Sequence, residues 1–382
     1  MATPEPGFAL YVHWPFCLSK CPYCDFNSHV RNEIDHPRWT SALLSELDHY
    51  GRETTGRRLT SVFFGGGTPS LMTPDTVATL LDKLSIYWIL DDNLEVTLEA
   101  NPTSIESQKF CDFRTAGINR VSMGIQALDD GVLKFLGRGH SAAEATAALD
   151  IARDSFARFS FDLIYARPDQ TAESWRQELT AALALAGDHL SLYQLTIEPG
   201  TSFYRDEVKT LDDDRAADLY DLTQELMEAA DRPAYEISNH AKPGQESRHN
   251  LTYWRGGDYV GIGPGAHGRI SHGGHTEAAY QIHNPESWLS SVDADTHGTA
   301  KRRVLTPDMR AQELIMMGLR LRDGLDTSAI SRQTGLTVAE VIDDTARRQL
   351  IEGGILAASD GRLRVTADGR LRLNSVIRLL LK

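Results

Sequence analysis

The chain has 382 residues, of which 41% are hydrophobic and 24% are charged, and this composition is typical of a globular protein. Its 39 basic and 53 acidic side chains give a formal net charge of −14. This charge argues against broad binding to nucleic acid, and we expect contact with a membrane to be peripheral at most. No run reaches the roughly 20 apolar residues of a membrane span. The segment Met1–Gly7 lacks the basic and apolar regions of a signal peptide, so we expect none.

Short apolar runs alternate with segments of helical spacing through the first part of the chain. The expected strands are Phe8–His13, Ser61–Phe64, Leu94–Glu99, Arg120–Ile125, Phe159–Ile164 and Leu190–Ile197. The expected helices are Pro37–Tyr50, Thr73–Leu84, Ile105–Ala116, Ala142–Asp154 and Ala172–Leu185. Such alternation builds a parallel sheet with right-handed crossovers. We therefore predict an α/β fold, a partial (β/α)6 barrel over residues 1–233, with its chemistry at the C-terminal strand ends.

Two further segments follow this barrel. Residues 234–300 are rich in glycine and histidine, and we expect a loop-rich extension there. Residues 301–382 should form a smaller winged-helix-like α+β domain. Its expected elements are the helices Asp308–Leu321, Thr327–Gly335 and Val338–Glu352, a hairpin around Gly361 and a helix Asp368–Leu381. Its basic residues alternate with acidic ones, so a platform that closes the side of the barrel is favoured over nucleic-acid binding.

Three of the four cysteines, Cys17, Cys21 and Cys24, fall within eight residues directly after the first expected strand. Their thiolates can hold three irons of a [4Fe-4S] cubane and leave the fourth iron open. That iron could chelate S-adenosylmethionine (SAM), whose reductive cleavage yields a 5′-deoxyadenosyl radical. Zinc is the alternative, but zinc sites usually supply four ligands. Cys111 is expected to be a small buried side chain. This cysteine usage favours a reducing compartment, the cytoplasm.

The segment from Tyr11 to Ser28 reads YVHWPFCLSKCPYCDFNS and resembles the HemN-like radical SAM family. Within that family the chain looks most like the HemW branch, whose members are regarded as haem chaperones. The likeness extends over essentially the whole chain, including the C-terminal module. It implies that Cys17, Cys21 and Cys24 are the metal ligands of the cluster.

The resemblance also implies a SAM site at successive strand ends. The glycine run Gly65–Pro69 matches the element that binds the methionine amino group. Glu99 and Gln126 would contact the ribose hydroxyls or the amino group, Arg138 the methionine carboxylate and Asp162 the ribose. Two tyrosines match positions against the cluster and the adenine. The expected SAM-binding residues are Tyr11, Tyr23, Gly66, Gly67, Thr68, Glu99, Gln126, Arg138 and Asp162.

The family's well-known enzyme, the oxygen-independent coproporphyrinogen III oxidase, differs from this chain in two ways. The oxidase pattern has a further cysteine two residues after the third, where this chain has Phe26. The oxidase also carries an N-terminal extension over its substrate cavity, whereas only seven residues precede the first expected strand here. Both departures weaken the expectation of oxidase activity.

A second motif points to haem. The segment from His249 to Trp254 reads HNLTYW and matches the HNxxYW motif associated with HemW. Imidazole is a good axial ligand for haem iron, and aromatic side chains can stack on a porphyrin. We expect His249 to be the haem ligand. The alternative ligands are Tyr253, His240, His267 and His272. The expected haem-contact residues are His249, Asn250, Tyr253 and Trp254.

Together these resemblances imply a protein that binds a [4Fe-4S] cluster, SAM and haem and delivers haem to an acceptor, with a respiratory haem protein as one candidate. A flavodoxin or ferredoxin would donate electrons, and a homodimer is one candidate oligomeric state. The alternative is an oxygen-independent coproporphyrinogen III oxidase or a related radical SAM tetrapyrrole enzyme. No catalytic residue is assigned, and whether the chain is an enzyme stays open.

Overall fold

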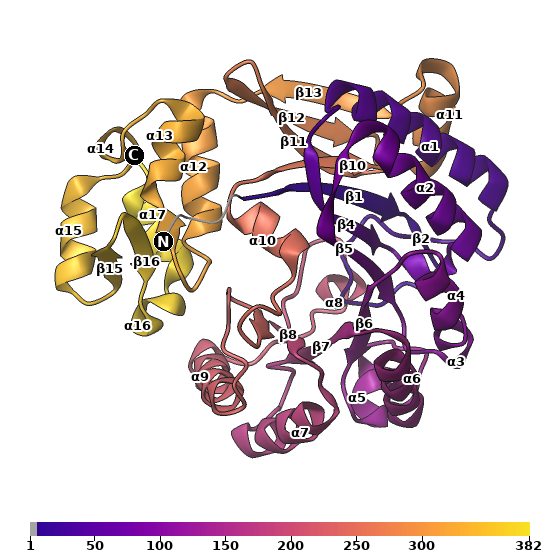
Figure 1. Cartoon of the computed structure of the whole chain (residues 1–382). Coiled ribbons are helices and arrows are strands. Elements are labelled where there is room, and N and C mark those ends of the chain that lie inside the picture. Colours follow the sequence, from indigo (N-terminus) through magenta and orange to yellow (C-terminus); the bar gives the residue numbers. More distant parts are fainter. Residues whose placement is uncertain (1–5) are drawn as a thin grey trace.

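The computed structural model describes residues 6–382 (Figure 1), so the expectation about a signal peptide in Met1–Gly7 concerns residues that lie mostly outside it. Its centre is a run of neighbouring parallel strands. In spatial order they are β1 (Phe8–Trp14), β4 (Arg58–Gly66), β5 (Ile89–Ala100), β6 (Arg120–Gln126), β7 (Arg158–Tyr165) and β8 (His189–Gln194). Each overlaps one of the expected strands, and the predicted α/β fold is confirmed.

The crossover helices form the periphery of the barrel, with the strands inside them (Figure 1). Most of them begin at a side-chain cap: the Ser141 side chain, for example, accepts a hydrogen bond from the backbone of Glu144. The expected helix 105–116 is broken into two short helices. The helical segments are α1 (His36–Glu53), η1 (Pro69–Leu71), α2 (Pro74–Tyr87), α3 (Ser104–Ser107), α4 (Phe110–Thr115), α5 (Asp130–Phe135), α6 (Ala142–Ser155), α7 (Ala172–Leu185), α8 (Ser202–Arg205) and α9 (Asp213–Ala229).

The segment 234–300, which we expected to be loop-rich, instead extends the main sheet at both edges. One strand pairs antiparallel with β8, and another lies parallel to β1 and is followed by an antiparallel meander. The elements are β9 (Asn239–Ala241), α10 (Arg248–Trp254), β10 (Asp258–Ile262), β11 (His267–His272), β12 (His275–Gln281), α11 (Pro285–Asp295) and β13 (Thr299–Val304). The resulting sheet has eleven strands, and β13 and β9 are its open edges, so the barrel is partial.

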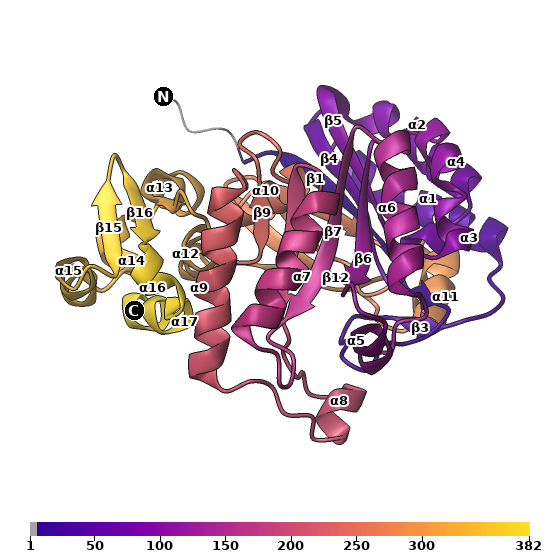
Figure 2. The same cartoon turned by 90° about the horizontal axis from the view of Figure 1, so that it is seen from below.

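The C-terminal domain comprises the elements from α12 onward and has its own hydrophobic core. Two expected helices, 338–352 and 368–381, are each divided; Asp343 caps the second half of the first one. The elements are α12 (Pro307–Gly318), β14 (Leu325–Asp326), α13 (Thr327–Thr334), α14 (Val338–Val341), α15 (Asp344–Glu352), β15 (Leu356–Ser359), β16 (Arg362–Val365), α16 (Ala367–Arg370) and α17 (Leu373–Leu380). The domain lies beside α9 and α10 (Figure 2).

One buried and one partly buried polar contact fix this domain to the barrel. Arg310 of α12 donates to the backbone oxygen of Gly256 at 2.6 Å, and Arg269 of β11 pairs with Glu313 at 2.9 Å. Both pairs join α12 to the segment that follows α10, so the helix carrying the HNxxYW motif is held between the two units. Within residues 6–382, no helix is long and apolar enough to cross a membrane.

Candidate functional site

The three clustered cysteines lie in the loop that leaves β1, which also forms the small strands β2 (Phe16–Cys17) and β3 (His29–Val30). Cys17, Cys21 and Cys24 are free thiols of intermediate exposure. Burial raises the pKa of Cys17 and Cys24, and the nearby thiols add to the rise. Three thiols that repel one another's ionisation form a donor set that a positively charged metal centre would stabilise. The loop therefore fits an iron–sulfur cluster held at three corners.

The glycine run after β4 holds this cysteine loop directly. Gly67 donates its N–H to the oxygen of Trp14 at 2.7 Å, and Thr68 donates to the oxygen of Phe16 at 2.8 Å. A Cβ at Gly67 would lie 2.6 Å from that Phe16 oxygen, and Gly66 adopts a φ of +117°. Both positions therefore require glycine for reasons that involve no ligand. Sequence reasoning assigned these glycines to SAM and missed their contact with the loop.

A hydrogen-bonded chain links two of the cysteines through neighbouring strand ends. Thr68 donates to the Cys17 sulfur at 3.4 Å, and Asn101 donates to Thr68 at 3.2 Å. Arg138 donates through Nη2 to Asn101 at 2.6 Å and through Nη1 to the Cys21 sulfur at 3.2 Å. Sequence reasoning missed Asn101, although it stands two residues after a predicted strand-end carboxylate. The chain fixes the spacing between the sulfurs and the barrel.

One guanidinium nitrogen of Arg138 has no hydrogen-bond partner among the described residues. Its Nε is buried without a hydrogen-bond partner, while the other guanidinium nitrogens contact protein atoms. A buried N–H without an acceptor is costly unless a ligand supplies one. An anionic group beside the cysteine loop would satisfy it, which fits the carboxylate expected there.

Two acidic side chains on neighbouring parts of the sheet, Glu99 of β5 and Asp162 of β7, interact electrostatically. Burial, with a contribution from Asp162, raises the pKa of Glu99 to about 8, and burial raises the pKa of Asp162 to about 6. Glu99 also accepts the N–H of Gly66 at 3.1 Å. Carboxyls held in this way can exchange hydrogen bonds with ligand hydroxyls, as a ribose would offer. Gln126 ends β6 nearby with a φ of +71°.

The two expected tyrosines take different positions. Burial, followed by the effect of Glu99, raises the pKa of Tyr11, whose hydroxyl hydrogen-bonds His13 at 3.0 Å. Its ring stacks on Phe63, with centroids 6.3 Å apart. Tyr23 lies instead within the cysteine loop, where burial raises its pKa and Arg138 opposes the rise. Tyr23 is therefore beside the cysteines, and Tyr11 is deeper, toward the HNxxYW segment.

The structure places His249 in the core. Its side chain is 2% exposed, its Nδ1 hydrogen-bonds Ser61 at 3.1 Å and its Nε2 hydrogen-bonds the Tyr253 hydroxyl at 2.6 Å. Burial lowers its pKa to about 3. Neither ring nitrogen is open to a haem iron in this arrangement. The expectation of an accessible ligand came from assigning the segment to a loop. The segment is instead the helix α10, whose His249 side packs on β1 and β4.

The other residues of α10 are less enclosed. Asn250, Tyr253 and Trp254 are all of intermediate exposure. The Trp254 indole N–H has no partner, and the Arg320 guanidinium lies 5.3 Å from the centre of its ring. Among the alternative ligands, His240 is 1% exposed. The remaining two alternatives, His267 and His272, are exposed on β11.

A network of buried charged side chains lies next to His249, and no local sequence pattern indicated it. Glu95 pairs with Arg158 at 2.6 Å and also accepts the N–H of His249 at 3.1 Å. Arg120, 2% exposed, donates to Ser160 at 2.8 Å. An apolar filling is usual in a closed (β/α)8 barrel. These buried charges depart from that filling and are paired within the protein.

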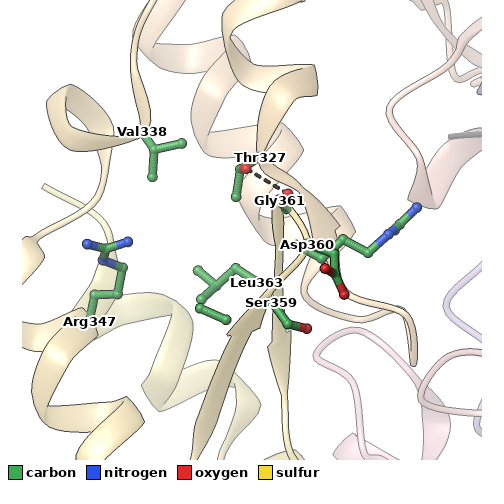
Figure 3. Close-up of a pocket in the computed structure, with 9 residues that line it drawn as sticks. Thr327, Val338, Arg347, Ser359, Asp360, Gly361 and Leu363 are labelled. Carbon is green, nitrogen blue, oxygen red and sulfur yellow. Dashed lines mark hydrogen bonds between the residues drawn. The ribbon is translucent and has the colours of Figure 1, made fainter. Parts of the chain in front are cut away.

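A separate hollow of about 270 Å³ lies in the C-terminal domain (Figure 3). Thr327 and Asp360 line it at one side and Arg347 at the other, and Thr327 donates to the oxygen of Gly361 at 2.7 Å. None of the expected site residues lines this hollow. We assign it no role.

Comparison with known proteins identifies the family. Residues 11–182 match the radical SAM superfamily, and residues 305–372 match the HemN C-terminal domain. The chain is 37% identical to "Heme chaperone HemW" of Escherichia coli over 98% of both chains. The chain belongs to the HemW group of radical SAM proteins. The predicted family is thereby confirmed.

The chain is also similar to an animal protein and to a more distant solved structure. The chain is 40% identical to "Radical S-adenosyl methionine domain-containing protein 1, mitochondrial" of Mus musculus, over 98% of this chain and 87% of the relative. The solved coproporphyrinogen III oxidase (HemN) of Escherichia coli superposes with a TM-score of 0.83 at 24% identity, over 99% of this chain and 90% of that one. That likeness shows that the HemW group and the oxidase share a fold.

Proposed function

We propose that this protein is a haem chaperone that binds a [4Fe-4S] cluster, SAM and haem, and passes haem to an acceptor protein. The observation that carries the proposal is the 37% identity, over 98% of both chains, to a relative named as a haem chaperone. The three free thiols and their tethers to the strand ends support the cofactor part of the proposal.

In this proposal Cys17, Cys21 and Cys24 hold three irons, and the residues around them receive SAM. When bound, the cluster supplies an open iron that chelates SAM and an electron for its sulfonium. Arg138 offers its unpaired Nε to the SAM carboxylate, and Glu99 offers its carboxyl to hydroxyl groups. The glycine run and Thr68, Gln126, Asp162, Tyr11 and Tyr23 complete the proposed set.

For haem, we propose that the partly exposed side of α10 makes the contact. Tyr253 would offer its oxygen to the iron after releasing its hydrogen bond with His249, because a tyrosine oxygen is an established haem ligand. Trp254 and Asn250 lie on the same short helix. His249, the ligand preferred from the sequence, lies behind Tyr253 and shares a hydrogen bond with its hydroxyl. To reach iron itself, His249 would have to release Ser61 or Tyr253.

Haem titration of matched variants tests this assignment. Tyr253→Phe removes the oxygen, His249→Ala removes the group behind it, and His283→Ala changes an exposed histidine outside α10. We expect Tyr253→Phe to shift the haem Soret band and weaken binding, and His283→Ala to behave as the wild type. If both α10 variants bind haem with the wild-type spectrum and affinity, the segment is not the haem site.

Partners follow from the same proposal. Leu18, Phe26 and Val30 on the cysteine loop are 57%, 59% and 52% exposed, which supports docking of another protein at this loop. We propose an electron donor such as a flavodoxin or ferredoxin for this surface, and a respiratory haem protein as the acceptor. A homodimer and a cytoplasmic location also belong to the proposal.

The oxidase alternative has its own test. Cluster-loaded protein is incubated anaerobically with a reductant, SAM and coproporphyrinogen III, and the tetrapyrroles are separated by chromatography. We expect no protoporphyrinogen. Its formation at more than one turnover per chain, lost in Cys21→Ala, would replace the chaperone proposal with an enzymatic one.

A further inference from the structure

A second group of potential metal ligands lies outside the cysteine loop, on the hairpin formed by β11 and β12. His272, His275 and Glu277 each present one ligand atom, and these three atoms lie within 4.8 Å of one another. His272 is also one of the alternative haem ligands named from the sequence, whereas His275 and Glu277 have no part in the site described above. Two imidazoles and a carboxylate are a common ligand set for zinc and other first-row transition ions.

The turn of the hairpin explains why the three side chains meet. Gly273 and Gly274 form a two-residue connection with φ values of +57° and +82°, a conformation that favours glycine at both positions. The turn makes His272 and His275 direct cross-strand partners. Glu277 follows His275 by two residues on the same strand, so both point to the same face of the sheet.

Two of the three distances between ligand atoms are close to those around a tetrahedral ion. The His272 Nε2 lies 3.3 Å, and the His275 Nε2 3.6 Å, from the same oxygen of Glu277, Oε1. Both exceed the usual 2.7–3.2 Å range of an N–H···O hydrogen bond. With metal–ligand bonds of about 2.0–2.1 Å, a tetrahedron separates its ligand atoms by about 3.3–3.4 Å. Small rotamer adjustments would therefore complete the geometry.

The carboxylate is already oriented for this role. Arg302 donates to the other oxygen of Glu277, Oε2, through Nε at 2.9 Å and also approaches it with Nη2 at 2.8 Å. Arg302 is held in turn by Glu53, at 2.8 and 2.9 Å. Partial burial works to raise the pKa of Glu277, but Arg302 outweighs it and lowers that pKa below its usual value. Outer contacts of this kind fix a ligand and sharpen metal affinity.

We propose that His272, His275 and Glu277 form a binding site for one divalent first-row transition ion, with Zn²⁺ as the probe that tests it. Three protein ligands leave a fourth position for water or for an outside donor. The site adjoins a hollow of about 600 Å³ that His272, Glu277 and Arg302 help to line, which gives that position room. The site is independent of the cysteine loop and of the proposed haem contact at α10.

The test is Zn²⁺ titration calorimetry on the full chain, loaded with its cluster so that the cysteines are occupied. The variants are His275→Ala, Glu277→Gln and the double variant His272→Ala/His275→Ala, with His283→Ala as the matched control. All four changes are on partly or fully exposed side chains. Zinc X-ray absorption on the same samples separates nitrogen and oxygen ligands near 2.0 Å from sulfur ligands near 2.3 Å.

We expect the wild type and His283→Ala to bind one Zn²⁺ through nitrogen and oxygen ligands alone. Each single ligand variant should weaken this binding at least about tenfold, as loss of metal-supporting groups generally does. The double variant should lose that equivalent altogether. If the double variant binds Zn²⁺ as the wild type does, or if all bound Zn²⁺ has sulfur ligands, the proposal is refuted. The second outcome would mean that the cysteine loop has taken up zinc, and it would therefore also count against the cluster proposal.

Discussion

Replacing Gly67 with alanine tests whether the glycine run physically holds the cysteine loop. The added Cβ would lie 2.6 Å from the Phe16 oxygen and 2.9 Å from its carbonyl carbon. These are backbone atoms, so no side-chain rotation can relieve the contact. To reach an ordinary distance of 3.4 Å, the Phe16 oxygen must retreat by about 0.8 Å.

That retreat has a cost that follows from two hydrogen bonds. The bonds from Gly67 to Trp14 and from Thr68 to Phe16, now 2.7 and 2.8 Å long, would lengthen beyond the hydrogen-bond range. Losing both costs about 1–3 kcal/mol. Overpacking a filled site costs about 1–3 kcal/mol more. We therefore expect Gly67→Ala to lower the free energy of unfolding by about 2–6 kcal/mol.

Urea unfolding followed by tryptophan fluorescence measures this change, because Trp14 beside the loop is fully buried. Iron and sulfide content per chain provides a second measurement, and we expect it to fall. Gly139→Ala is the matched control, since its Cβ would meet nothing within 4 Å. If Gly67→Ala unfolds at the wild-type urea concentration and retains wild-type iron, the proposed packing of the loop on the glycine run is incorrect.

Further predictions concern buried charges. Glu95→Gln removes the carboxylate that compensates the fully buried Arg120 and pairs with the partly buried Arg158, and it should cost about 3–5 kcal/mol in urea unfolding; an unchanged midpoint would contradict this. Burial lowers the pKa of His240 to about 3. The pKa of histidine in the unfolded chain is about 6.5, so the stability gained by burying neutral His240 is complete above pH 6.5 and declines by about 2 kcal/mol at pH 5. Between pH 7 and 5, the free energy of unfolding of His240→Gln should therefore fall less than that of the wild type. Arg138→Lys cannot reproduce the forked contacts to the Cys21 sulfur and the strand ends, so it should lose iron on desalting while its far-ultraviolet circular dichroism stays unchanged.

Elements with strong local signals could be predicted from the sequence. Helix α7 has the predicted bounds, because Thr171 caps it and Trp175, Leu179 and Ala182 give it one continuous buried face. Cys111 shows the limit of that reasoning. It was expected to be buried but is exposed, since α4 turns Phe110 and Phe113 toward the core and leaves Cys111 off that face.

The missed parts depend on contacts between distant segments. Strand β10 has only five residues, with Val260 and Ile262 as its fully buried apolar side chains, and it is stabilised by pairing with β1. No local pattern distinguishes such a strand from a loop. The cysteine loop was evident from its spacing alone, whereas its hydrogen bonds with Thr68 and Asn101 arise from the fold. The buried state of His249 likewise follows from the packing of α10.

The pairing of β1 with β10 has a consequence for synthesis of the chain. Phe8 pairs with Asp258, 250 residues later, so β1 waits for one of its two neighbours until most of the protein has been made. At about 5–20 residues per second, that wait lasts roughly 12–50 s on the ribosome. During it, the strand that leads into the cysteines has an unprotected hydrogen-bonding edge. Iron that reached the nascent chain would meet a cysteine loop whose preceding strand is still unpaired along one edge. We therefore expect iron insertion to follow release of the completed polypeptide.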